Sequence, residues 1–238
     1  MRSVFQGKDL ARCVMGALGA VAMVANALAG SLQVMVLDRN GKLLADAVVI
    51  VVPEGRGVAK NPPPMSALVN QEKMQFVPAV TVVSPGAKIR FANSDPWDHQ
   101  VRVSAPGLAL SSNLAASGGA APSPNDGFSL RLEGKTDGKP AKTADVTLDQ
   151  PGATGTSILG CFIHGSMSGH IYVAESPWTV KTSSEGVATL DDLPDGVISV
   201  KVWHALQLVE PLPQKLVVGA TPAKLTVQVD VVPRRRRI

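Results

Sequence analysis

Short β-branched runs separated by glycine and proline turns constrain the fold of this chain more than any other feature. Residues 48–52 read VVIVV, a continuous run typical of a strand that is buried on both faces. KIRFAN, at 88–93, alternates as a half-buried strand does, and Asn40-Gly41 is a strong turn signal. We find no long amphipathic helical pattern and no sequence repeat. Regular turns between short strands favour β-sandwiches, so we predict an all-β protein.

A proline-rich segment divides this strand pattern. Residues 31–53 read as two strands joined by a turn, and residues 74–173 read as a longer series of strands. Between them, 54–71 contains three consecutive prolines, which fit neither a helix nor a sheet ladder. We interpret 54–71 as a linker between domains, or else as a long loop within one domain. Residues 105–127 lack a hydrophobic period and read mostly as a mobile loop. Residues 178–232 again show short strands separated by turns, as 31–53 do, so we expect these two segments to pair in one sheet system.

The N-terminal residues 1–29 have the composition of a secretory signal peptide. Positive charges at Arg2, Lys8 and Arg12 precede an apolar stretch, and Ala27-Leu28-Ala29 fits the small-x-small cleavage pattern. We therefore expect cleavage, export to the periplasm or beyond, and a mature chain that begins near residue 30. The alternative is an uncleaved membrane anchor, although the run is short and rich in alanine and glycine for a span. No later stretch is long and apolar enough to cross a bilayer, so we expect no stable membrane span.

Cleavage would lower the formal charge of the chain from +4 to +2. Four of the remaining positive charges are the consecutive arginines 234–237, so the folded body is close to neutral and we expect no nucleic-acid partner. We interpret residues 234–238 as a solvated basic tail. Docking of this tail to an acidic partner or to anionic lipid is the alternative.

Cleavage would also remove Cys13 and leave Cys161 as the single cysteine of the exported chain. One cysteine cannot form an internal disulfide, so its thiol requires another explanation: intermolecular pairing, chemical reactivity or a metal ion.

The sequence around Cys161 favours the metal. In CFIHGSMSGHIYV, a thiol, an imidazole and a thioether follow one another at three-residue intervals, in Cys161, His164 and Met167. His99 lies upstream in NSDPWDHQV. One thiolate, two imidazoles and a weak thioether are the ligands of a mononuclear copper electron-transfer site. A structural zinc site would want more thiolates. The remaining alternative is a non-metal site, with Met167 in the core and both histidines at the surface.

Residues from about 71 to 174 resemble a cupredoxin, and the loop spacing is most similar to amicyanin and the related plastocyanin-like blue copper proteins. KIRFAN, the loop to His99, the turn DQPG and CFIHGSMSGHIYV carry this resemblance. It implies a Greek-key β-sandwich over 67–174 that binds one type 1 copper ion through His99, Cys161, His164 and Met167. It also implies that His164 lies nearest the surface, where electrons pass to and from a redox partner protein.

Two neighbouring positions bear on the same resemblance. Asn93 matches a position at which polar groups tie the two ligand loops together. Gln100 follows the first histidine ligand where the family usually has asparagine, which leaves the surroundings of His99 open.

The flanking segments resemble a different fold. GSLQVMVLDRNGKLLADAVVIVVP and TVKTSSEGVATLDDLPDGVISVKVWH resemble a carboxypeptidase-regulatory-like (transthyretin-like, immunoglobulin-like) β-sandwich. The resemblance implies a discontinuous domain over 30–66 and 175–233, split around the inserted cupredoxin. The whole arrangement resembles bacterial exported proteins labelled methylamine utilisation protein.

The two other histidines are not predicted ligands. We expect His170 to face solvent, and we interpret His204 as structural, together with Trp203 at a domain edge. Trp178 and Trp203 are the possible platforms for a glycan, and both are better explained as core residues.

We therefore favour a periplasmic blue-copper electron carrier. The alternatives are a copper-handling protein without a redox role and a non-catalytic binding or scaffold protein. We expect no enzymatic activity: a multicopper oxidase needs more histidines than the four in this chain, and no residue can be named to orient a Cys/His hydrolase.

Overall fold

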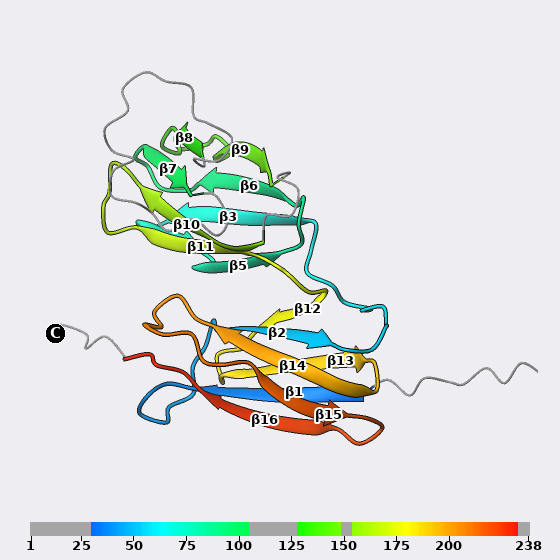
Figure 1. Cartoon of the computed structure of the whole chain (residues 1–238). Helices are drawn as coiled ribbons and strands as arrows, with labels where there is room; N and C mark the ends of the chain where they lie inside the picture. The colour runs from blue at the N-terminus through cyan, green and yellow to red at the C-terminus, as the bar shows by residue number, and fades with distance from the viewer. Residues whose placement is uncertain (1–29, 105–127, 149–153, 233–238) are drawn as a thin grey trace, which may run out of the picture.

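The computed structural model describes residues 30–104, 128–148 and 154–232, and these residues form sixteen β-strands and no helix (Figure 1). The prediction of an all-β sandwich protein is confirmed. The expected signal peptide at 1–29, the loop at 105–127, the turn DQPG at 149–152 and the basic tail at 234–238 lie outside the described residues.

Strands from both ends of the described chain form one sandwich, which we call the terminal sandwich (Figure 1). Its two sheets have the strand orders β13-β1-β16 and β12-β2-β14-β15. Aliphatic side chains from both sheets share one hydrophobic core. The strands are β1 (Gly30–Leu37), β2 (Val48–Pro53), β12 (Trp178–Lys181), β13 (Val187–Leu193), β14 (Gly196–Trp203), β15 (Gln214–Val218) and β16 (Ala223–Gln228).

The middle of the chain forms the second sandwich, which we call the central sandwich (Figure 1). Its sheets have the orders β5-β11-β10-β7-β8 and β4-β3-β6-β9, and they enclose a core of their own around Phe91 and Leu159. The strands are β3 (Ser66–Glu72), β4 (Gln75–Val77), β5 (Val80–Val83), β6 (Lys88–Asn93), β7 (His99–Val103), β8 (Phe128–Leu132), β9 (Lys142–Thr147), β10 (Gly155–Cys161) and β11 (Ser168–Val173).

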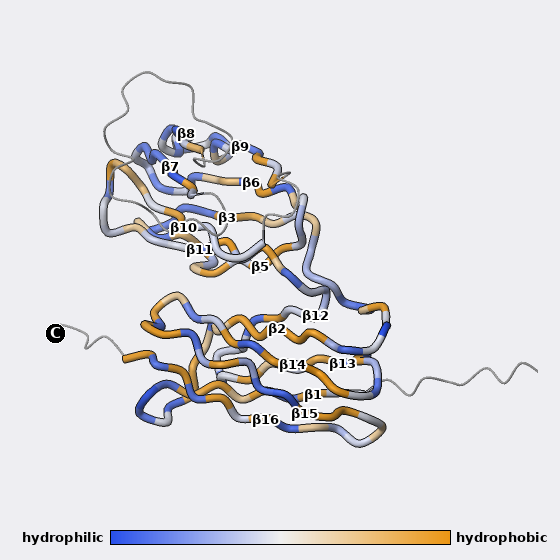
Figure 2. Tube along the Cα trace, in the orientation of Figure 1, coloured by the Kyte–Doolittle hydropathy of each residue, from blue (hydrophilic) through white to orange (hydrophobic). Residues whose placement is uncertain are grey.

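Strand β2 is buried on both faces, as its sequence predicts, and it lies where the two sandwiches meet. Val49 and Val51 belong to the core of the terminal sandwich. Side chains alternate across a strand, so Val48 and Ile50 point the other way, where they pack with Tyr172 of the central sandwich. Figure 2 shows that β2 is hydrophobic along most of its length. The continuous β-branched run of β2 therefore contributes side chains both to the core of the terminal sandwich and to the contact between the two sandwiches.

The interpretation of all of 54–71 as a linker or loop is wrong at its C-terminal end, because residues from Ser66 onward form β3. The triple proline ends at Pro64, and Val69 and Gln71 then alternate inward while β3 pairs parallel with β6. Strands β1 and β2 pair with β13, β14, β12 and β16, which is the pairing expected for 31–53 and 178–232. The division into domains at 66/67 and 174/175 stays a prediction.

Candidate metal centre

His99 and Cys161 approach one another because they lie on neighbouring strands. His99 begins β7 and Cys161 ends β10, and the two strands pair antiparallel with Val101 opposite Cys161. Residues directly opposite share a face of the sheet, as do residues two apart on one strand. His99 and Cys161 therefore both point into the central sandwich, and their exposed fractions are 0% and 5%.

His164 reaches the same point from the loop that follows β10. The N–H of Met167 donates to the carbonyl of His164 at 3.0 Å, which closes a turn directly before β11. His164 is half-buried, whereas Met167 is buried in the same hydrophobic core as Cys161. The structure thus places the Met167 side chain in the core beside Cys161, and its role as fourth ligand stays a prediction.

Three donor atoms form a compact triangle at this point. The Sγ of Cys161 lies 3.6 Å from the Nδ1 of His99 and 3.6 Å from the Nδ1 of His164, and the two nitrogens are 3.1 Å apart. A point equidistant from the corners of such a triangle is about 2.0 Å from each, close to the usual metal–imidazole distance and a little short of the metal–thiolate distance. The donor set therefore fits one metal ion in a trigonal plane, as a mononuclear copper site requires. The three residues are also the one cluster of this kind among the described residues.

Asp95 holds the other side of the His99 ring. Its Oδ2 lies 2.9 Å from Nε2 of His99, and the carboxylate also accepts the N–H groups of Lys73 at 2.6 Å and Met74 at 3.0 Å. Burial raises the pKa of Asp95, but the donors from Met74, His99 and Lys73 outweigh it, so the pKa lies below its ordinary value. An ionised carboxylate only accepts hydrogen bonds. Nε2 of His99 therefore carries the hydrogen, and Nδ1 keeps its lone pair toward Cys161.

Sequence reasoning missed Asp95. The available signal was its position in NSDPWDH, four residues before His99, in a loop that joins two strands. A carboxylate that hydrogen-bonds the far nitrogen of a ligating histidine is a common way of fixing the ring.

Asn93 does not connect the two ligand loops, as the resemblance implied, but connects two other segments. Its side-chain amide donates to the carbonyls of Trp97, Leu132 and Glu133, at 2.9, 3.2 and 3.0 Å, and its oxygen accepts from the N–H of Asp95. These bonds fix the loop before His99 against the end of β8, not against the loop of Cys161 and His164.

The link between the two ligand segments is a backbone bond. The N–H of Phe162 donates to the carbonyl of Gln100 at 2.9 Å, directly beside both His99 and Cys161. The side chain of Gln100 points elsewhere and donates to Ser129. The unusual glutamine is therefore compatible with the link, because the backbone carbonyl makes it.

The other two histidines lie away from this triangle. His170 is half-buried, whereas we expected it to face solvent: its ring packs edge-on against Trp203 of the terminal sandwich, with ring centroids 5.5 Å apart. Strand β11 forms part of the junction between the sandwiches, which explains the burial. His204 is buried, and its Nδ1 accepts the N–H of Leu206, consistent with a structural role.

Comparisons with known proteins find similarity among solved structures alone. No family model matches the chain, and no curated protein matches it. The structure is similar to auracyanin from Roseiflexus castenholzii, with 19% identity, 47% of this chain and 98% of that chain covered, and a TM-score of 0.37. It is also similar to amicyanin from Paracoccus versutus, with 17% identity, 52% and 96% covered, and a TM-score of 0.30. A reduced Cu(I) form of an amicyanin variant gives 18% identity, 52% and 97% covered, and a TM-score of 0.30.

The fold and the site together define an all-β protein of two sandwiches with one candidate mononuclear metal centre, built from His99, Cys161 and His164 at one end of the central sandwich.

Proposed function

We propose that this protein is an exported, periplasmic type 1 copper protein that carries electrons to and from a partner protein. The observation that carries the proposal is the triangle of one sulfur and two nitrogens, whose centre accommodates a metal ion. A thiolate and two imidazoles, with a thioether from Met167 close in sequence, favour copper over zinc or a hard cation.

The described residues are arranged to hold such a site still. His99 is fixed by Asp95 on its far nitrogen, Cys161 by the β7–β10 ladder, and His164 by the turn that Met167 closes. A copper ion supplies reversible one-electron exchange. If the donors keep their positions in both oxidation states, the reorganisation energy of each electron transfer is low. Such an arrangement favours an electron carrier over a copper-storage site.

Exposed apolar residues beside the ligands support docking of a partner. Phe162 and Ile163 lie between Cys161 and His164 in the sequence and are 61% and 50% exposed. The guanidinium of Arg102 lies 5.8 Å from the centre of the Phe162 ring. Large exposed apolar side chains in a cluster commonly mark an interaction surface, so we propose that a redox partner approaches His164 across Phe162 and Ile163.

The proposed location follows from the sequence of residues 1–29, and we propose that this segment is a cleaved signal peptide. Within the described part of the chain, no helix could cross a membrane. We also propose that the protein has no catalytic activity of its own, because a multicopper oxidase needs more histidines than the four in this chain.

Absorption spectroscopy of the copper-loaded protein tests this proposal. We expect an intense visible thiolate-to-copper band that disappears in Cys161→Ser and persists in His170→Ala, which replaces a histidine outside the triangle. Absence of the band in the native protein, or its persistence in Cys161→Ser, would sink the assignment.

Electron exchange separates a carrier from a copper-handling protein that uses the same ligands. We expect the loaded protein to be reduced and reoxidised repeatedly while it retains copper against a competing chelator. Rapid loss of copper to the chelator on reduction would favour copper delivery instead.

A further inference from the structure

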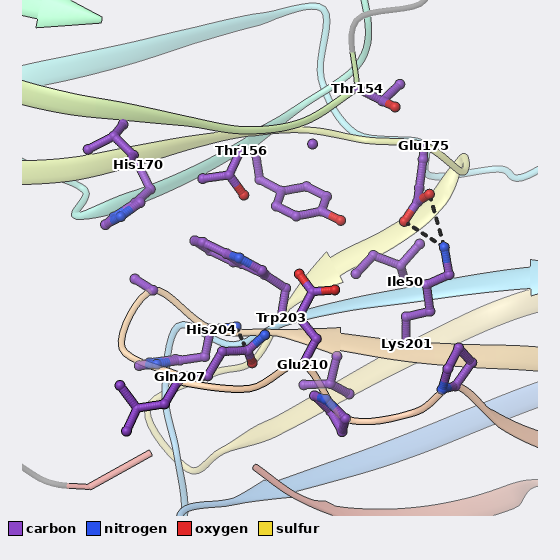
Figure 3. Close-up of a pocket in the computed structure, with 18 residues that line it drawn as sticks. Ile50, Thr154, Thr156, His170, Glu175, Lys201, Trp203, His204, Gln207 and Glu210 are labelled. Carbon is purple, nitrogen blue, oxygen red and sulfur yellow. Dashed lines mark hydrogen bonds and ion pairs between the residues drawn. The ribbon is translucent and has the colours of Figure 1, made fainter. Parts of the chain in front are cut away.

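A cavity of about 730 Å³ lies at the junction of the two sandwiches, away from the candidate metal centre (Figure 3). Strands β10 and β11 of the central sandwich line one side. Strand β14 and the loop that follows it line the other side, in the terminal sandwich. This volume is in the range of small-molecule sites, and such sites occur preferentially between domains.

The charged groups of the cavity leave one negative charge uncompensated. Lys201 and Glu175 neutralise each other, since Nζ of Lys201 lies 3.1 Å from Oε2 of Glu175. Glu210 also lines the cavity; it is an exposed residue, and it has no hydrogen bond or ion pair with the described residues. Figure 3 shows its carboxylate beside the ring of Trp203. The cavity therefore favours cations over anions.

Aromatic rings form the wall next to this carboxylate. Trp203 is half-buried, and its ring centroid lies 5.5 Å from that of His170 and 5.4 Å from that of Tyr172. The contacts with His170 and Tyr172 hold the indole in place across the junction. The ring nitrogens of His170 have no hydrogen bond with the described residues. Tryptophan is the side chain that attracts a cation most strongly through its π face.

We infer that this cavity binds an organic cation of the ammonium or guanidinium type, with Glu210 as counter-ion and Trp203 as the aromatic wall. A neutral polyol could also stack on an indole, but it would gain no attraction from the exposed Glu210 carboxylate. Two sources can supply such a cation: a free small molecule, or the arginines 234–237 of the chain itself.

The second source lies within reach of the cavity. Leu208 lines the cavity, and its N–H donates to the carbonyl of Asp230 at 3.2 Å. Arg234 follows Asp230 by four residues, a length of chain that spans up to about 13 Å. The chain length between Asp230 and Arg234 is therefore short enough for the arginines to be tested as occupants of the cavity.

NMR titration of the full-length protein with ethylguanidinium tests the inference, with the indole N–H signal of Trp203 as the readout. Ethylurea has the same shape without the charge and is the matched ligand control. The readout makes no use of the copper spectrum, so the inference can fail or succeed independently of the proposed function. Trp203→Phe assigns the signal.

We expect ethylguanidinium to bind and ethylurea not to bind. We expect Glu210→Gln to raise the Kd by about two- to fivefold, because it removes an exposed counter-ion. Glu133→Gln, at an exposed carboxylate on the central sandwich, should leave the Kd unchanged. Equal binding of ethylurea, or an unchanged Kd in Glu210→Gln, would overturn the inference.

A full-length variant with all four arginines 234–237 replaced by glutamine distinguishes the two sources. Equal affinity in this variant and in the native protein identifies a site for a free cation. Affinity at least about tenfold higher in the variant identifies the arginines as the natural occupant, since they would compete for the cavity in the native chain. If the native protein and this variant both fail to bind, the inference is overturned.

Discussion

Replacing Asp95 with alanine should weaken both the fold and the metal site. The carboxylate is 4% exposed and pairs with three N–H groups, those of Lys73 and Met74 and the imidazole of His99. A buried donor left without a partner costs about 1–3 kcal/mol. Only His99 is buried among the three donors, and water can satisfy the N–H groups of the exposed Lys73 and Met74. We therefore expect the free energy of unfolding to fall by about 1–3 kcal/mol, measured by urea denaturation of the metal-free protein.

The same change should lower the affinity for copper by about 10–100-fold, because it frees the ring and the tautomer of His99. Competition against a chelator of known affinity measures this loss. Asp95→Asn keeps one side-chain oxygen, so we expect an intermediate result. The matched control is Asp137→Ala, at an exposed position with no described hydrogen bond, which should change neither quantity. If Asp95→Ala retained native copper affinity while it lost stability, Asp95 would support the hairpin of Lys73 and Met74 and not the metal centre.

Three further changes test other parts of the structure. Hydrogen bonds from Arg90 and Lys88 hold the pKa of Asp145 well below its usual range. These contacts therefore stabilise the fold at neutral pH, and the stabilisation is lost progressively as the pH falls from about 4 toward the lower pKa of the folded state. The urea midpoints of the native protein and of Asp145→Asn should approach each other on acidification, and a constant difference would contradict this. In Gly134→Ala, the new methyl group would overlap the carbonyl oxygen of Pro96. We therefore expect the free energy of unfolding to fall by about 1–3 kcal/mol in thermal or urea denaturation. A native-like midpoint would show that the loop moves at little cost. Ile50→Ala should destabilise the protein by about 2–4 kcal/mol and increase proteolytic cleavage between the sandwiches, and unchanged protease resistance would show that the junction does not depend on this side chain.

The strand pattern was readable from the sequence where side-chain alternation and turns agree. VVIVV predicted burial on both faces of β2, and the structure confirms it. The limit of the proline-rich segment was not readable, because β3 depends on pairing with β6, a contact that only the tertiary structure provides. The same reason explains His170, whose partner Trp203 is distant in sequence and lies on the other sandwich.

The sequence predicted the donor residues of the candidate metal centre, but not the groups that hold them in place. The regular spacing of His164 and Met167 after Cys161, together with a histidine upstream, indicated the donors. The structure brings His99, Cys161 and His164 together, and it leaves the role of Met167 as a prediction. Asp95 and the carbonyl of Gln100 act through hydrogen bonds whose partners depend on how loops fold, and no spacing rule encodes those contacts.

X-ray absorption at the copper edge of the loaded protein, in both oxidation states, identifies the atoms bound to the metal. We expect one sulfur neighbour from Cys161 and two nitrogen neighbours from His99 and His164, with the same set in the oxidised and the reduced protein. A spectrum without a thiolate sulfur, or loss of a nitrogen neighbour on reduction, would contradict a rigid electron-carrying copper site.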